Sequence, residues 1–208
     1  MAYYCRLSFN SNGWFTPSGF QGKSTNRDNH ECEFGFGFEE WLFNSRKFID
    51  TKSEKCHFGY IDSLKDYNEN TNIKKDLVLY TIRHVKKGTE RFIVARLKKE
   101  EWDYINKQDY LNIAGANEPL IAEMKRELIA TMPMLRSRII SSRFDQQVNC
   151  QDWNGLNSNS HRLFNIQILK TPFCPKMERV TDQTPFPDRH VLKLQRFKLF
   201  NSEQFNLL

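Results

Sequence analysis

The chain has 208 residues, which fits one domain with a sizeable core and leaves little room for a second full domain. Its 17 phenylalanines and 13% aromatic content exclude an intrinsically disordered chain. A net charge of +6 favours a polyanionic partner. We therefore expect a single domain over residues 1–208, with 132–190 as a candidate appendage.

Cysteine usage and hydropathy bear on the compartment. The five cysteines are odd in number and irregularly spaced, which is typical of free thiols in a reducing environment. The first residues resemble an incipient strand more than a secretory leader, and no apolar run approaches the roughly 18 residues of a membrane span. The expected location is the cytoplasm.

The first third of the chain predicts short elements separated by long loops. Tyr3–Phe9 is aromatic and apolar and ends in the turn sequence Asn-Ser-Asn-Gly, so we predict a strand there. Gln21–Glu33 is polar without periodicity and is predicted to be a loop. Phe38–Phe43 predicts a short helix, because its early carboxylates complement the helix dipole. Cys56–Asp62 alternates weakly and predicts another strand.

The middle of the chain predicts a hairpin and two helices. Asp76–Val85 and Arg91–Leu97 are rich in β-branched and aromatic residues and flank Gly88, which predicts a β-hairpin with Gly88 in the turn. Consecutive apolar positions in both strands imply cover on both faces, as in a barrel wall backed by helices. Lys98–Lys107 predicts a helix, and a stronger helix is predicted from a cap at Asn117 to about Thr131.

The last part of the chain predicts two more strands, Leu163–Leu169 and Val191–Phe200, separated by a proline-bearing loop over 171–188. Strands at both chain ends with helices between them predict an α+β fold. It would be a mixed β-barrel or curved sheet flanked by helices, whose first and last strands could share one sheet.

Two glycine- and aromatic-rich stretches, Asn10–Ser24 and Gly35–Asn44, do not fit a simple core pattern. Glycine permits close backbone approach, Trp and Phe offer flat faces, and amides offer edge-reading hydrogen bonds. These properties suit a planar, polar-edged ligand such as a nucleobase. The alternative for each single aromatic residue is burial in the core. The candidate base-binding residues are Trp14, Phe36, Phe38, Trp41, Asn44 and Trp153.

The same stretches carry a resemblance to a known family. The matching residues are Leu7-Ser8-Phe9-Asn10, Trp14, Pro17-Ser18-Gly19, Gly22-Lys23-Ser24 and Gly35-Phe36-Gly37-Phe38-Glu39-Glu40-Trp41-Leu42-Phe43. They resemble N-terminal specificity modules of bacterial modification-dependent restriction systems, which precede an McrB-type AAA+ motor or an HNH nuclease. The resemblance covers roughly the first quarter of the chain and, loosely, the hairpin near Tyr80, but not the C-terminal half. It implies a reader of modified DNA on a PUA-like fold of the EVE, YTH and SRA kind. The chain departs from the pattern at Phe38, where many relatives carry His.

Basic side chains supply candidate phosphate contacts. The segment Met134–Arg143 is the most one-sided in charge, with no acid between Glu127 and Asp145. The candidates are Lys23, Ser24, Arg136, Arg138, Arg143, Lys193 and Arg196. Gly22-Lys23-Ser24 is not a P-loop, because the first glycine of that motif falls at Pro17 and the following residues are too polar for a packed helix.

Catalytic and metal motifs are weak. His30, Cys32, Cys56 and His57 lack the spacing of metal ligands, so we expect neither a metal nor a cofactor. Glu123-Met124-Lys125 matches the Glu-x-Lys pattern of a nuclease motif. That motif needs its carboxylates on adjacent strands around a metal ion, whereas these residues lie in the middle of a predicted helix. If the protein is an enzyme, the carboxylates among aromatic residues are Glu39, Glu40, Asp145 and Asp152.

Three functions follow from these patterns. The leading hypothesis takes its function from the resemblance: the chain would be the sensor of a restriction or phage-defence system, which flips a modified base of double-stranded DNA into an aromatic pocket. Cleavage would then belong to a separate nuclease or AAA+ subunit. The alternatives are a DNA glycosylase that excises the flipped base, and an RNA-binding module.

Overall fold

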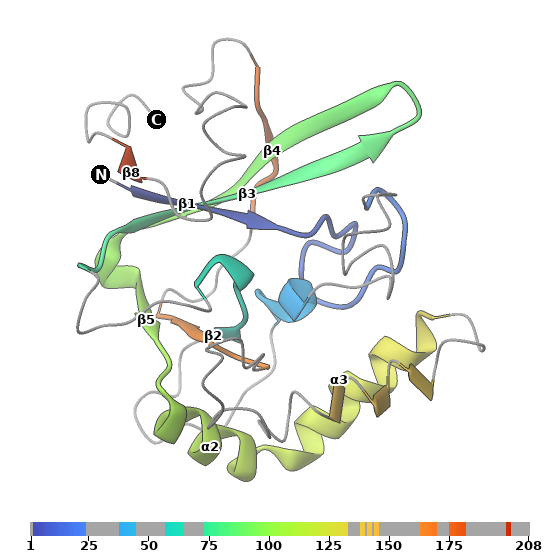
Figure 1. Ribbon diagram of the computed structural model, residues 1–208, viewed down its shortest axis with the longest axis vertical. Helices are drawn as coiled ribbons and strands as arrows, with labels where there is room; N and C mark the ends of the chain where they lie inside the picture. The colour runs from blue at the N-terminus through green and yellow to red at the C-terminus, as the bar shows by residue number, and fades with distance from the viewer. Residues whose placement is uncertain are drawn as a thin grey trace.

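The computed structural model describes residues 2–23, 38–44, 57–64, 73–132, 138–139, 141–142, 144–145, 163–169, 175–181 and 199–200. These residues form an α+β structure with two β-sheets, the α-helices α2 and α3, and further helical residues at 138–139, 141–142 and 144–145 (Figure 1). The five-stranded sheet has the order β7-β4-β3-β1-β8, and the three-stranded sheet has the order β2-β6-β5. The α+β prediction is confirmed.

The predicted hairpin forms the centre of the larger sheet. β3 (Asp76–Val85) pairs antiparallel with β4 (Gly88–Leu97), and Gly88 has a φ of 135° at the turn. β1 (Ala2–Leu7) runs parallel to β3, with Leu7 opposite Thr81. The hairpin prediction is therefore confirmed.

The two ends of the chain meet in this sheet. β8 (Leu199–Phe200) pairs antiparallel with β1, so that Ala2 lies opposite Phe200. This pairing confirms that the first and last strands share a sheet. The other edge strand, β7 (Glu178–Arg179), lies in the segment that we predicted to be a loop.

The smaller sheet corrects one prediction. It contains β2 (His57–Gly59), β6 (Ile166–Ile168) and β5 (Trp102–Tyr104). Lys98–Lys107 is therefore not a helix: a single 3₁₀ turn, η3 (Lys99–Glu101), leads directly into β5. Trp102 is fully buried opposite Ile168, so sheet pairing and core packing outweigh local helix propensity there.

The two α-helices follow each other closely. α2 (Lys107–Ala116) was not predicted, although Asn106 caps it by accepting a hydrogen bond from the Asp109 N–H. α3 (Glu118–Ala130) agrees with the predicted helix and buries Ile121, Met124 and Leu128. Two further 3₁₀ turns are η1 (Phe38–Trp41) and η2 (Asp62–Leu64).

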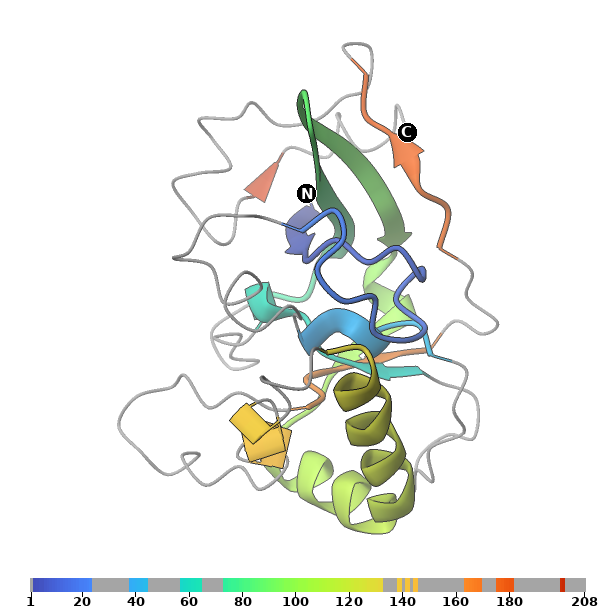
Figure 2. The ribbon, with the colours of Figure 1, turned by 90° about the vertical axis from the view of Figure 1, so that its right-hand side faces the viewer.

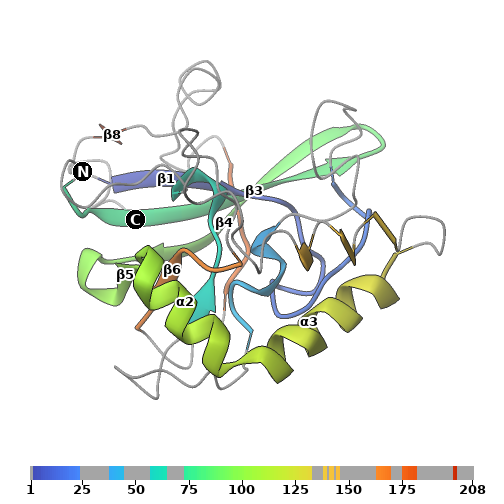
Figure 3. The same ribbon diagram turned by 60° about the horizontal axis from the view of Figure 1, so that its bottom comes forward.

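The elements form three layers, seen edge-on in Figure 1 and from two other sides in Figures 2 and 3. One apolar cluster lies between the two sheets and includes Leu79, Trp102 and Ile166. A second lies between the smaller sheet and the helices and includes Phe58 and Leu128. Among the described residues, the smaller sheet and not a helix covers this face of the hairpin, which corrects the prediction that helices back it there.

No closed barrel is present among the described residues, since the larger sheet ends in separate edge strands β7 and β8. Within the same residues, no helix has both the length and the apolar composition to cross a membrane.

Candidate nucleic-acid interface

The first loop, Asn10–Lys23, is organised around the side chain of Asn10. The Asn10 Oδ1 accepts hydrogen bonds from the backbone N–H of Asn12 at 2.6 Å and of Trp14 at 3.2 Å. Its Nδ2 donates to the carbonyl of Thr16 at 2.9 Å. One amide thus satisfies backbone groups on both sides of the turn, which gives a polar sequence a defined loop structure.

Trp14 sits in this loop with a left-handed backbone. Its φ is 62°, a region that costs a bulky residue energy unless its surroundings impose it. Here the indole N–H donates to the Ser8 carbonyl at 3.0 Å, and the Trp14 carbonyl accepts from the Phe43 N–H at 3.0 Å. The Trp14 side chain is 0% exposed and meets Phe43 edge to face, with ring centroids 6.4 Å apart.

A buried carboxylate joins the loop to η1. One oxygen of Glu40 accepts from the Asn10 amide and from the Ser18 N–H at 3.1 Å. The other oxygen pairs with the Lys23 ammonium, and both side chains of this ion pair are 1% exposed. Glu40 therefore ties together the start, middle and end of the Asn10–Lys23 loop.

Trp41 fixes η1 from the opposite side. Its indole N–H donates to a Glu127 carboxylate oxygen on α3 at 3.0 Å. Its ring packs edge to face on Phe144, with centroids 6.1 Å apart, in the cluster under the helices. Trp14 and Trp41 thus belong to two different core clusters on the two sides of η1.

Asn44, the third described base-binding candidate, lies inside the protein as well. Its amide donates to the carbonyls of Trp41 at 2.5 Å and Phe58 at 3.5 Å. Its own carbonyl accepts a hydrogen bond from His57 Nδ1 at 2.6 Å. These bonds connect the end of η1 to β2. Trp14, Trp41 and Asn44 thus occupy interior positions, which favours the packing alternative for these three residues.

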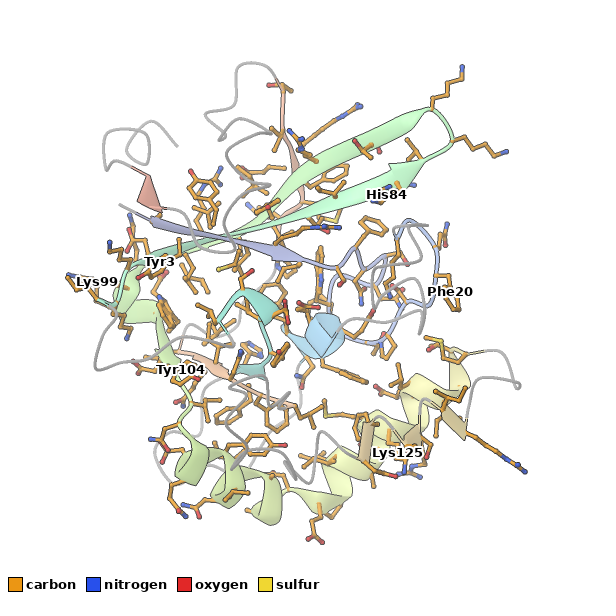
Figure 4. The ribbon with its side chains drawn as sticks, viewed as in Figure 1. Tyr3, Phe20, His84, Lys99, Tyr104 and Lys125 are labelled. Carbon is orange, nitrogen blue, oxygen red and sulfur yellow. The ribbon has the colours of Figure 1, made fainter. Side chains whose placement is uncertain are left out.

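The other three base-binding candidates lie wholly or partly outside the described residues. Phe38 begins η1, but its side chain lies outside the described residues, as do Phe36 and Trp153. The outer face of the first loop presents Ser11, Asn12, Phe20 and Gln21. Phe20 is 39% exposed and lies at the outer edge of the loop (Figure 4), a feature that sequence reasoning missed because it singled out only tryptophans there.

Two of the phosphate-binding candidates are described. Lys23 is 3% exposed and engaged with Glu40, so in this conformation its ammonium faces the interior. Arg138 is exposed beyond the end of α3. The remaining candidates, Ser24, Arg136, Arg143, Lys193 and Arg196, lie outside the described residues.

The carboxylates proposed for catalysis have structural partners. Glu40 pairs with Lys23, and Asp145 pairs with Lys125 at 2.6 Å. Glu39, 4% exposed, accepts from the Asp62 N–H at 3.4 Å. Asp152 lies outside the described residues, as do Cys32 and Cys56. Within the described part of the chain, no group of three or more potential ligands is placed to hold a metal ion.

Comparisons with known proteins add no relative: no family model, no curated protein and no solved structure matches the chain.

Proposed function

We propose that this protein binds double-stranded DNA that carries a modified base, and that it is the sensor of a restriction or phage-defence system. The observation that carries the proposal is the Asn10–Lys23 loop, which combines a strained Trp14, a buried Glu40–Lys23 pair and an exposed aromatic tip. Strain at a residue whose surroundings impose it is common at ligand-binding sites. The sequence resemblance to modified-DNA specificity modules involves the same residues.

In this proposal Trp14 and Trp41 position the site. They hold the loop and η1 from the two core clusters, so that the outer loop surface keeps one conformation. A preorganised surface loses less conformational entropy when it binds a ligand. The flipped base then stacks on an exposed aromatic side chain of the loop, for which Phe20 is the described candidate.

The fold is consistent with this assignment at a coarse level. Mixed sheets with peripheral helices offer loops at one side of the sheet, where binding residues commonly lie. A PUA-like arrangement of the kind implied by the resemblance remains part of the proposal, and the cytoplasm is the compartment in which such a sensor would meet foreign DNA.

The test is an affinity panel on matched duplexes that contain plain, methylated, hydroxymethylated or glucosylated cytosine. The wild-type protein should prefer one modified duplex. Phe20→Ala should lose this preference, by about 1 to 3 kcal/mol or roughly 5- to 150-fold, because a base–aromatic stack is removed. Leu111→Ala is the matched control, since Leu111 is a similarly exposed apolar residue on α2.

Each outcome has a defined meaning. Equal binding of all duplexes by the wild-type protein would overturn modified-base recognition. A retained preference in Phe20→Ala would remove Phe20 from the pocket. Abasic sites formed from a modified duplex would identify a glycosylase, and tighter binding of single-stranded RNA would identify an RNA-binding module.

A further inference from the structure

The β3–β4 hairpin extends beyond the strand that flanks it. β1 ends at Leu7, opposite Thr81, and the Thr81 hydroxyl donates to the Leu7 carbonyl at 2.9 Å. The remaining residues of β3 continue to Val85 and turn back at Gly88, and the resulting arm projects from the sheet (Figure 1). The arm is a two-stranded ribbon with an exposed tip.

The arm is strongly basic. From Ile82 to Arg91 the sequence contains one acidic residue, Glu90, and four lysines and arginines. Two arginines pair with the Glu90 carboxylate. Arg83 Nη1 lies 3.8 Å from Glu90 Oε2, and Arg179 Nη2 lies 3.0 Å from Glu90 Oε1. The carboxylate therefore does little to offset the positive charge of the tip.

Lys86 and Lys87 form that tip. Both side chains are exposed, and neither ammonium pairs with any residue in the described part of the chain. Two adjacent unpaired lysines at the end of a projecting ribbon repel each other and attract an anion. Such an arrangement concentrates positive charge at the point that first meets a partner.

The base of the arm is fixed. The Arg83 guanidinium lies over the Phe9 ring, 5.7 Å from its centroid. On the other strand, the Val180 N–H donates to the Arg91 carbonyl at 2.9 Å. These contacts hold both strands below the tip, so binding would order little beyond the two lysine side chains.

The arm is also connected to the loop that carries Phe20. The His84 N–H donates to the Gly22 carbonyl at 2.9 Å, and Gly22 lies two residues after Phe20. Figure 4 shows His84 and Phe20 on the same side of the molecule. A partner that reaches Phe20 would therefore pass close to the arm.

We propose that the β3–β4 arm binds the backbone of duplex DNA beside the base that is read, with Lys86 and Lys87 on its phosphates. In this arrangement the two-stranded ribbon lies along the major groove of B-DNA, which is wide enough for it, and the two lysines reach the phosphates that line the groove; the major groove of A-form RNA is too narrow and deep. This inference rests on the proposed function: the arm would supply affinity without discrimination between bases.

The experiment measures the affinity for one modified and one plain duplex at several salt concentrations. For K86Q/K87Q the slope of log K against log salt should become shallower by about 2, because each phosphate contact contributes roughly 0.9. Affinity at 0.1 M salt should fall roughly 10- to 100-fold for both duplexes, and the preference for the modified duplex should persist.

The matched control is K98Q/K99Q, which makes the same charge change in an adjacent lysine pair near the other end of the hairpin. Both lysines are exposed: the Lys98 ammonium lies 3.4 Å from an Asp76 carboxylate oxygen, and the Lys99 ammonium lies 3.9 Å from a Glu100 carboxylate oxygen. Surface ion pairs of this kind add little stability. The control should retain the wild-type slope.

The outcomes separate the two proposals. An unchanged slope in K86Q/K87Q, or an equal change in K98Q/K99Q, overturns the DNA-binding role of the arm and leaves modified-base recognition intact. A reduced slope with equal wild-type binding of both duplexes supports the arm and overturns modified-base recognition. Tighter salt-dependent binding of duplex RNA, or no binding of either duplex, overturns the DNA assignment of the arm.

Discussion

Lys23 and Glu40 form a fully buried ion pair that no local sequence pattern predicts. The two residues are 17 positions apart, and Glu40 also accepts hydrogen bonds from the Asn10 side chain and the Ser18 backbone. A buried charge that loses its partner remains desolvated without compensation. Residues that first suggest phosphate binding and catalysis are thus part of the structure that holds the loop.

Removing one partner of this ion pair should lower the stability of the protein. We expect Lys23→Met to lower the free energy of unfolding by about 3 to 5 kcal/mol, because Glu40 is left as an unpaired buried charge. Urea denaturation measures this change. The double variant Lys23→Met/Glu40→Gln is the control and should recover part of the loss. A stable Lys23→Met variant with weakened DNA binding would instead assign Lys23 to phosphate contact.

Burial of Cys5 makes the stability of the protein depend on pH. Burial raises the pKa of the Cys5 thiol to about 12 from its ordinary value of 9.0. The folded state therefore favours the neutral thiol. The contribution of the neutral thiol to stability is complete below pH 9 and is lost as the pH rises from 9 towards 12, because the unfolded chain ionises first.

We expect the free energy of unfolding to fall more steeply above pH 9 in the wild-type protein than in Cys5→Ala, by up to about 1.4 kcal/mol per pH unit. Urea titrations at several pH values from 8 to 10.5 test this difference. Parallel curves for the two proteins would contradict it. Burial also raises the pKa of Tyr4, which contributes to both curves alike. The pKa values of Tyr3 and Tyr80 are raised by burial and further by the charge of Cys5, so their share of the pH dependence is larger in the wild-type protein and adds to the difference in the same direction.

At the scale of elements, β2 and η1 approach each other closely because Gly59 has no side chain. A Cβ added at Gly59 would lie 2.5 Å from Leu42 Cδ1 and 2.9 Å from Leu42 Cα. Gly115 near the end of α2 has no atom within 4 Å of such a Cβ. The two glycines therefore differ in their structural role.

Gly59→Ala should destabilise the protein by about 1 to 3 kcal/mol, because the backbone after η1 must shift away from β2. Gly115→Ala should stabilise it by about 0.4 to 1 kcal/mol, because alanine reduces the entropy of the unfolded chain and fits the helix. Thermal and urea denaturation of the two variants measure both signs. A neutral Gly59→Ala would mean that η1 and β2 can separate without cost.

At the scale of the whole molecule, the smaller sheet contributes to both core clusters. Ile166 and Ile168 pack towards the larger sheet, whereas Phe58 packs under the helices. The helices and the larger sheet are therefore coupled through one shared layer, and we expect them to unfold together.

Leu128→Ala on α3 and Leu79→Ala on β3 should each lower the stability by about 2 to 5 kcal/mol, since both side chains are fully buried. In each variant the urea midpoint from circular dichroism at 222 nm, which follows the helices, should match that from tryptophan fluorescence, which includes Trp14 and Trp102 between the sheets. Separate midpoints would show that the layers unfold independently.

Local sequence patterns predict the elements whose signals are strong. The Asp76–Val85 strand, its turn at Gly88 and the helix after Asn117 follow from β-branched runs, glycine and helical spacing. The predicted cap is wrong in its chemistry, because the Asn117 side chain donates to the Ile113 carbonyl of α2 and makes no capping bond to α3. The α+β class and the pairing of the first and last strands followed from the order of these elements. The aromatic and glycine pattern also placed η1 and the Asn10–Lys23 loop together in one candidate site, although it did not predict how they are joined.

Features that depend on distant partners follow from the tertiary structure and not from local patterns. Trp102 lies in a strand because Ile168 pairs with it across 66 positions, which outweighs a local preference for helix. Lys23, Trp14 and Trp41 face inward because Glu40, Ser8 and Glu127 provide partners for their polar atoms. Local sequence specifies which groups must be satisfied, whereas only the assembled chain determines which groups satisfy them and which remain at the surface.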